Sequence, residues 1–290
     1  MPNKNLRGAA FFLTALFLFA VSDATAKYLS AFFAVALLVW VRYLSQFVFM
    51  LVAVAPTMGR AIVTTRRPWL MIFRALTQVA STVFVLLAFR SLPLAETTAL
   101  VFISPILVAL LAGPLLGEKL HLRSALATLA GFVGVLLIVR PGGAMTGVGV
   151  VYALASALSY SLYQILTRKL AASEPPLRQL FYIALVGSVC ASCLVPLFWS
   201  AILPSPTQAL LLLSLGFYGG AGHFLLIRAF HETPASRLSP MMYMQLLWAM
   251  LLGWAIFGQL PDFVSVVGML IIGASGLALV LRWPRAARAA

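Results

Sequence analysis

Charged side chains are scarce in this sequence of 290 residues. Asp, Glu, Lys and Arg together make up 9% of it, and only six residues are acidic. A soluble domain has about a quarter of its residues charged, and a disordered chain is richer in charge and poorer in apolar side chains. The scarcity of charge therefore excludes both an ordinary water-soluble fold and a disordered chain.

Histidine and cysteine are also rare. His121, His223 and His231 show no i, i+4 pairing of the kind that holds a catalytic zinc ion. Cys190 and Cys193 lie in an apolar run, without the second ligand pair or βαβ context that a metal or redox site needs. Gly-x-Ser-x-Gly and Walker phosphate-loop patterns are missing. We therefore expect no metal, no cofactor and no enzymatic activity.

The sequence does contain long apolar stretches, and 63% of its residues are apolar. A helix that crosses a bilayer needs about 20 apolar residues. Breaks at charge, Pro and Gly divide the chain into ten such stretches. The predicted helices are 6–26, 31–55, 69–91, 94–117, 122–139, 147–170, 177–199, 207–228, 235–257 and 263–281. The expected fold class is an all-α membrane protein with ten transmembrane helices.

The positive charges indicate how these helices are oriented. The net charge is +14, but Lys and Arg occur singly or in pairs between apolar stretches and do not form the clustered basic face of a nucleic-acid-binding protein. With the N-terminus inside, most of them fall in the inner connections, and only Lys27, Arg90 and Arg140 fall in the outer ones. The positive-inside rule then predicts that both termini are cytoplasmic.

The two halves of the chain resemble each other. Pro93 recurs as Pro234 and Gly117 as Gly258, in each case 141 residues later. Each half contains five predicted helices, and because five is odd, the second half must enter the membrane from the opposite side. We therefore expect two inverted repeats, residues 1–140 and 141–290. This architecture is common in secondary transporters, which bind solute near the midplane between the repeats.

Several motifs resemble those of a known family. Residues 96–99, 104–105 and 116–120 (ETTA, SP and LGEKL) are similar to the fourth-helix signature of EamA-type proteins in the drug/metabolite transporter superfamily. Residues 131–134 and 140–142 resemble the family's fifth helix, 157–160 and 168–170 its sixth, and 228–230 its eighth-to-ninth junction. Gln259 stands where the second copy usually has glutamate. Within the family, the sequence is most similar to YddG-type exporters of aromatic amino acids. The resemblance implies a five-plus-five inverted fold and export of small metabolites.

Polar and aromatic side chains at midplane depth are the candidates for a solute site. Apolar walls accept the body of a solute, and a few polar groups must replace the water that its charged ends lose. The alternative for each aromatic residue is packing in the core or contact with lipid. The candidate substrate-binding residues are Gln78, Phe102, Tyr160, Tyr163, Gln164, His223 and Tyr243.

Asp23, Arg42 and Arg74 lie within predicted spans, and Lys27 follows the end of the first span; charge inside a bilayer is costly and usually functional. Asp23 precedes Lys27 by four residues, a spacing that predicts a helix-end ion pair or, alternatively, a gate or proton-responsive group. Arg42 lies near the middle of the second helix and Arg74 in the first turns of the third. Either arginine could hold a substrate carboxylate. The alternative for Arg74 is that its side chain snorkels to the cytoplasmic interface.

These observations favour a secondary transporter of the bacterial inner membrane. We expect it to export small organic metabolites, amino acids and above all aromatic ones, by alternating access in the lipid bilayer, with protons as a candidate coupling ion. The alternative within transport is a translocator of lipid-linked or nucleotide sugars. The alternative from another class is an intramembrane lipid-modifying enzyme, which would need convergent acid–base or metal groups that the sequence does not offer.

Overall fold

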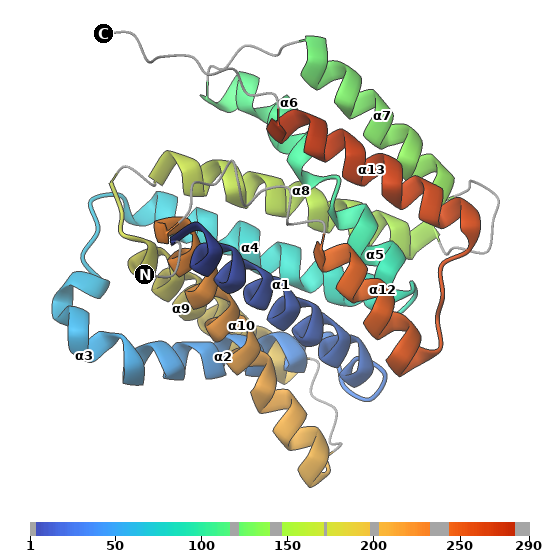
Figure 1. Ribbon diagram of the computed structural model, residues 1–290. Coiled ribbons are helices and arrows are strands. Elements are labelled where there is room, and N and C mark those ends of the chain that lie inside the picture. The colour runs from blue at the N-terminus through green and yellow to red at the C-terminus, as the bar shows by residue number, and fades with distance from the viewer. Residues whose placement is uncertain are drawn as a thin grey trace, which may run out of the picture.

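A computed structural model describes residues 4–116, 122–139, 147–170, 173–197, 203–232 and 244–281, and every regular element in these ranges is a helix (Figure 1). The first half contains α1 (Lys4–Leu29), α2 (Val35–Ala53), α3 (Ala55–Met58), the short 3₁₀ helix η1 (Gly59–Ile62), α4 (Pro68–Phe89), α5 (Leu94–Val101), α6 (Ser104–Leu116) and α7 (Leu122–Val139). The second half contains α8 (Gly147–Leu170), α9 (Pro176–Leu194), the 3₁₀ helix η2 (Val195–Leu197), α10 (Pro206–Glu232), α12 (Met244–Phe257) and α13 (Phe263–Leu281). The expected all-α fold is confirmed for these residues.

Six helices in the described ranges are long and apolar enough to cross a membrane. They are Arg7–Leu29, Val35–Val52, Pro68–Phe89, Gly147–Thr167, Pro176–Leu197 and Pro206–Leu226. Shorter apolar helices cover Leu94–Val108, Leu129–Ile138, Met244–Phe257 and Phe263–Ser275. Large apolar side chains such as Leu129, Phe132 and Leu210 are more than half exposed, which suits contact with lipid and not with water. The chain is therefore a multi-pass helical membrane protein.

Local sequence signals explain where several helices begin and end. α7, α8 and α13 have the bounds that the sequence predicts. α10 begins after a capping box, in which the Ser205 N–H donates to Gln208 Oε1 at 3.0 Å and the Gln208 N–H donates to Ser205 Oγ at 3.3 Å. α13 begins after Asp262, whose Oδ1 accepts a hydrogen bond from the Ser265 N–H at 2.8 Å. Gly258, with a φ of 64°, follows the end of α12 in the left-handed region that glycine tolerates.

The prediction of one continuous helix over 94–117 is wrong. α5 ends at Val101, and α6 begins at Ser104. Pro105 lacks an N–H, and its ring would collide with the carbonyl group of Val101, four residues earlier, if the helix continued. The chain therefore turns at 102–103. Interrupted helices of this kind form solute and ion sites in secondary transporters.

Other predicted boundaries also differ from the structure, and the second and ninth predicted helices are examples. The helix expected over 31–55 begins only at Val35, because α1 continues to Leu29 and residues 30–34 form the connecting turn. It ends at Ala53 and is followed by α3, which the sequence did not indicate. For the helix expected over 235–257, residues 235–243 lie outside the described residues, and α12 covers the remainder.

Helices that are distant in the sequence pack against each other. α1 lies along α10, α4 along α8, α7 along α13, and α2 between α9 and α10 (Figure 1). Small residues permit the closest of these approaches. A Cβ on Gly134 of α7 would lie 2.8 Å from the Gly268 carbonyl oxygen of α13, and one on Gly268 would lie 2.7 Å from the Gly134 oxygen. These two glycines therefore permit the close approach of α7 and α13.

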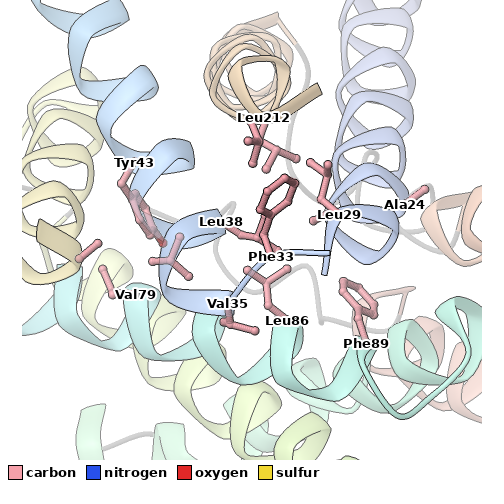
Figure 2. Close-up of a cluster of buried hydrophobic side chains, with 14 of the residues drawn as sticks. Ala24, Leu29, Phe33, Val35, Leu38, Tyr43, Val79, Leu86, Phe89 and Leu212 are labelled. Atoms are coloured by element: carbon pink, nitrogen blue, oxygen red, sulfur yellow. The ribbon is translucent and has the colours of Figure 1, made fainter. Parts of the chain in front are cut away.

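The larger buried apolar cluster lies where α1, α2, α4, α9 and α10 meet. Figure 2 shows the Phe33 ring at its centre, with Leu29, Leu38 and Leu212 around it. A second cluster lies among α5, α7, α8 and α13. Each cluster combines side chains from both halves of the chain, so the two halves form one packed bundle.

Candidate functional site

Two tyrosines on α8 form the aromatic part of the candidate site. Tyr160 and Tyr163 stand three residues apart on one helix face, and their rings stack with centroids 5.7 Å apart. Both side chains are half-buried. α8 is fixed against α4 nearby, where Ser156 Oγ donates to the Ser81 carbonyl oxygen at 2.9 Å. The two rings therefore have fixed positions against which a flat group could stack.

Arg74 of α4 lies beside these rings and is only 2% exposed. Its Nε donates to Thr167 Oγ1 at 2.7 Å, its Nη1 to the Gln179 carbonyl oxygen at 3.1 Å, and its Nη2 to the Tyr163 hydroxyl at 3.1 Å. The guanidinium carbon lies 4.6 Å from the centroid of the Tyr163 ring, a cation–π distance. The alternative that Arg74 snorkels to the interface is therefore wrong, because partners on α8 and α9 hold the side chain inside the bundle.

Asp23 of α1 faces the interior of the bundle. Gln245 of α12 points its Nε2 donor at Asp23 Oδ2 from 3.5 Å. The carboxylate also interacts electrostatically with Arg42 of α2 and with Tyr160 of α8. Arg42 in turn interacts electrostatically with His223 of α10. Five helices thus contribute to one polar group inside the bundle, which we call the central cluster: Asp23, Arg42, Tyr160, His223 and Gln245.

Lys27 lies one turn beyond Asp23 and has other partners. Its Nζ donates to the carbonyl oxygens of Phe89 at 2.9 Å and Leu92 at 2.6 Å, where α4 ends. It also interacts electrostatically with the buried Glu96 of α5. The expected helix-end pair between Asp23 and Lys27 is therefore wrong. Carbonyl groups at the C-terminal end of a helix lack partners within the helix, and the lysine binds them.

Six buried side-chain polar atoms have no hydrogen-bond partner in the part of the chain that the structure describes, and three of them lie on α4, α8 and α12. These three are Gln78 Oε1 on α4, Gln164 Nε2 on α8 and Trp248 Nε1 on α12. A polar atom buried without a partner is costly, and membrane proteins leave few of them. Gln78 and Gln164 were predicted as substrate-binding residues, and these two atoms are suitable for bonding to a polar solute.

The remaining predicted residues have mixed surroundings. His223 packs edge-on against Phe19 of α1, with ring centroids 4.9 Å apart, beside the central cluster. Phe102 lies in the interruption between α5 and α6, and it belongs to the second apolar cluster. Its buried ring packs against core residues, which is the alternative that we stated for aromatic candidates. Tyr243 lies outside the described residues.

A polar cluster between helices fixes the start of α4. Thr65 Oγ1 donates to Glu174 Oε1 at 2.5 Å, Arg178 Nη1 donates to Glu174 Oε2 at 2.6 Å, and Arg178 Nε donates to the Ala61 carbonyl oxygen at 2.7 Å. Burial opposes ionisation of Glu174, but the hydrogen bonds from Thr65 and Arg178 outweigh it, so the pKa of this carboxyl lies below its ordinary value. The cluster connects the segment between α2 and α4 to the segment between α8 and α9. It thereby fixes the start of α4 at Pro68, and Arg74 follows six residues later on the same helix.

The site residues that sequence reasoning missed are the partners of Arg74. Thr167 and Gln179 are far from Arg74 in the sequence, and only the packing of α4 between α8 and α9 brings them together. No three His, Cys, Asp or Glu side chains in the described ranges lie together as metal ligands would. The arrangement offers one guanidinium group with neutral partners, an Asp–Arg pair, stacked rings and amide groups. These groups can bind a polar organic solute.

The sequence matches a family of transporters and several known proteins. The model of the EamA-like transporter family matches residues 6–140 and again residues 147–282. The chain is 26% identical over 267 residues to the S-adenosylmethionine uptake transporter of Rickettsia prowazekii, covering 92% of this chain and 90% of that protein. It is 25% identical over 284 residues to the riboflavin transporter of Vibrio cholerae, covering 96% and 94%. A pseudopaline exporter of Pseudomonas aeruginosa is 28% identical over 195 residues, or 66% of this chain and 68% of that one.

The fold also matches a crystal structure, with a TM-score of 0.68 and 19% sequence identity, over 94% of this chain and 96% of the other. That likeness concerns the fold alone. The names of the three relatives do not mention aromatic amino acids, so the narrower resemblance to YddG-type exporters stays a prediction. The family match covers both halves of the sequence, and it confirms the resemblance seen in the motifs. The chain belongs to the EamA-like transporter family.

Proposed function

We propose that this protein is a secondary transporter of amino-acid-like metabolites with a flat ring, and that it works by alternating access. The observation that carries the proposal is the central cluster and its neighbours. Asp23, Arg42 and Arg74 bring charge into the bundle, while Tyr160 and Tyr163 provide stacked rings. Such groups suit a solute with charged ends and an aromatic side chain, because offset ring contacts add about 0.5–1.5 kcal/mol beyond burial.

A five-plus-five inverted architecture is part of the proposal. Exchange of the two repeats would relate α1 to α8, α2 to α9, α4 to α10 and α7 to α13. Four helix contacts support the proposal, because this exchange would convert the contact of α1 with α10 into that of α8 with α4, and would leave those of α2 with α9 and α7 with α13 unchanged. The family match to each half also supports two repeats. With ten helices, the positive-inside rule then places both termini in the cytoplasm.

The named relatives support a ring-bearing solute. S-Adenosylmethionine is an amino acid attached to a purine nucleoside, and riboflavin has a flat three-ring system; these are the solutes in the names of two relatives. We propose amino acids with aromatic side chains as the first solutes to test. Uptake and export both occur among the relatives' names. An alternating-access protein without a coupled ion moves its solute in the direction of the gradient.

Membrane location and coupling complete the proposal. We place the protein in the bacterial inner membrane, as expected for a helical multi-pass transporter whose named relatives are bacterial. Asp23 is our candidate for a proton-responsive residue, since it lies inside the bundle with Arg42 and Gln245. The solute leaves chemically unchanged, which distinguishes this function from that of an intramembrane enzyme.

The test is a flux screen with the purified protein in proteoliposomes. L-Tryptophan, L-phenylalanine, L-alanine, S-adenosylmethionine and riboflavin are compared, with and without an imposed pH gradient. Tyr163→Ala should reduce the flux of ring-bearing solutes more than that of alanine. Leu158→Ala is the matched control, because Leu158 is exposed on the same helix. The proposal fails if wild-type protein moves none of these solutes faster than empty liposomes, or if the recovered solute is chemically altered.

A further inference from the structure

Arg74 is a buried cation whose partners are all neutral within the described residues. A hydroxyl of Thr167, a backbone carbonyl group of Gln179 and the Tyr163 hydroxyl accept its hydrogen bonds. A guanidinium group that is 2% exposed inside a membrane protein ordinarily has an acidic partner or faces a functional cavity. These hydrogen bonds to neutral groups fix the position of the guanidinium group, but they do not balance its positive charge.

We infer that Arg74 binds the carboxylate group of the transported solute. This inference rests on the proposed function and deepens it, because it makes a negative charge a requirement for transport. Guanidinium has five N–H donors in a plane, and the three bonds above use one donor on each nitrogen. One further donor on each terminal nitrogen matches the two oxygens of a carboxylate, the geometry that arginine favours.

The charges inside the bundle favour a carboxylate over a phosphate. Lys27 and the buried Glu96 interact with each other and add no net charge. Besides these, Arg42 and Arg74 provide two positive charges, and Asp23 provides one negative charge close enough to Arg42 to interact with it. The remaining charge of this set is one positive, on Arg74, and a single carboxylate neutralises it. A phosphate group would add a second negative charge that no further cation of this set balances.

The position of Arg74 also suits a ring-bearing solute. Tyr163 contacts the guanidinium group through both its hydroxyl and its ring, and its ring stacks on Tyr160. A solute whose carboxylate binds Arg74 would therefore place its nearest apolar part beside these rings. Arg74 then selects for the acid group, and the tyrosines select for the side chain.

The first experiment compares L-tryptophan with tryptamine, which keeps the indole ring and the amine but lacks the carboxylate. Flux is measured in proteoliposomes at solute concentrations below saturation. Arg74→Gln should reduce tryptophan flux about tenfold or more, the fold-change expected from loss of a charged hydrogen-bonded pair, and should leave tryptamine flux within about twofold. Retained tryptamine flux shows that the variant is folded. Arg90→Gln is the matched control, since Arg90 is exposed just after the end of the same helix.

The second experiment needs no variant and so does not depend on folding of Arg74→Gln. Indole-3-propionate should inhibit tryptophan flux through the wild-type protein, whereas indole-3-propionamide and indoxyl phosphate should not. The inference is overturned if the amide competes as well as the acid, or if Arg74→Gln keeps the wild-type ratio of tryptophan to tryptamine flux. Failure of the proposed function itself would look different, because wild-type protein would then carry neither indole solute.

Discussion

A substitution at Gly187 of α9 tests how tightly this helix packs against Tyr43 of α2. Tyr43 of α2 is buried, and a Cβ on Gly187 would lie 2.6 and 2.8 Å from the Cδ1 and Cδ2 atoms of its ring. The ring has little freedom to move away, because the Tyr43 hydroxyl is 2.7 Å from Thr82 Oγ1 on α4. Overpacking of this kind costs about 1–3 kcal/mol, and loss of the hydroxyl contact would add about 1 kcal/mol. We therefore expect Gly187→Ala to destabilise the protein by about 2–4 kcal/mol.

A double-mutant cycle isolates this contact. Free energies of unfolding are measured in mixed micelles for the wild type, Gly187→Ala, Tyr43→Ala and the double variant. Tyr43→Ala removes the ring, so the added methyl group of Gly187→Ala should then cost less than about 0.5 kcal/mol, the usual limit for uncoupled sites. Gly147→Ala is the control, since a Cβ at Gly147 meets no atom within 4 Å. Equal costs of Gly187→Ala with and without the Tyr43 ring would refute the reasoning.

Three further predictions concern the site, the pH response and the topology. Tyr163→Phe should keep the ring contact with Arg74 but remove the hydroxyl that accepts its hydrogen bond, which should lower the free energy of unfolding by about 1.5–3 kcal/mol. Tyr163→Ala removes both contacts and should lower it further, so equal stability of the two variants would contradict this prediction. The pKa of Glu174 is lowered in the folded protein, so its carboxylate stabilises the fold at pH values above the ordinary carboxyl pKa. The free energy of unfolding that Glu174→Gln loses should therefore be greatest near neutral pH and should shrink as the pH falls below the ordinary carboxyl pKa. A loss that grows on acidification would contradict this prediction. Reporters fused after Arg67, after Arg123 and at the C-terminus should all be cytoplasmic, and an external signal from any of them would overturn the proposed topology.

The helices could be predicted because the bilayer sets their length. Apolar runs of about 20 residues, ended by charge, Pro or Gly, were enough to give the bounds of α7, α8 and α13. The break before Pro105 was not predicted within the helix expected over 94–117, since hydropathy does not register the missing N–H of proline. The interruption before Ser104 depends on hydrogen bonding, so the continuous apolar run concealed it.

The site was harder to predict because its contacts come from different helices. The spacing of Asp23 and Lys27 shows only that they share a helix face, and it cannot show which partners on other helices compete for them. Lys27 binds the carbonyl groups of Phe89 and Leu92, and Asp23 faces Gln245. The alternative that Arg74 snorkels to the interface came from its depth in the span alone, whereas the packing of α8 and α9 around α4 closes that route.

The packing of α1 on α10 has a consequence for the synthesis of the protein. α1 leaves the ribosome first, but its partner begins only at Pro206, so on the order of 10–40 s pass before the two can meet at about 5–20 residues per second. During that time the α1 face that becomes buried, with Ala15, Ser22 and Ala24, must remain in lipid or against a temporary partner. A nascent chain that is released before α10 is made would therefore leave this small-residue face without its helix partner.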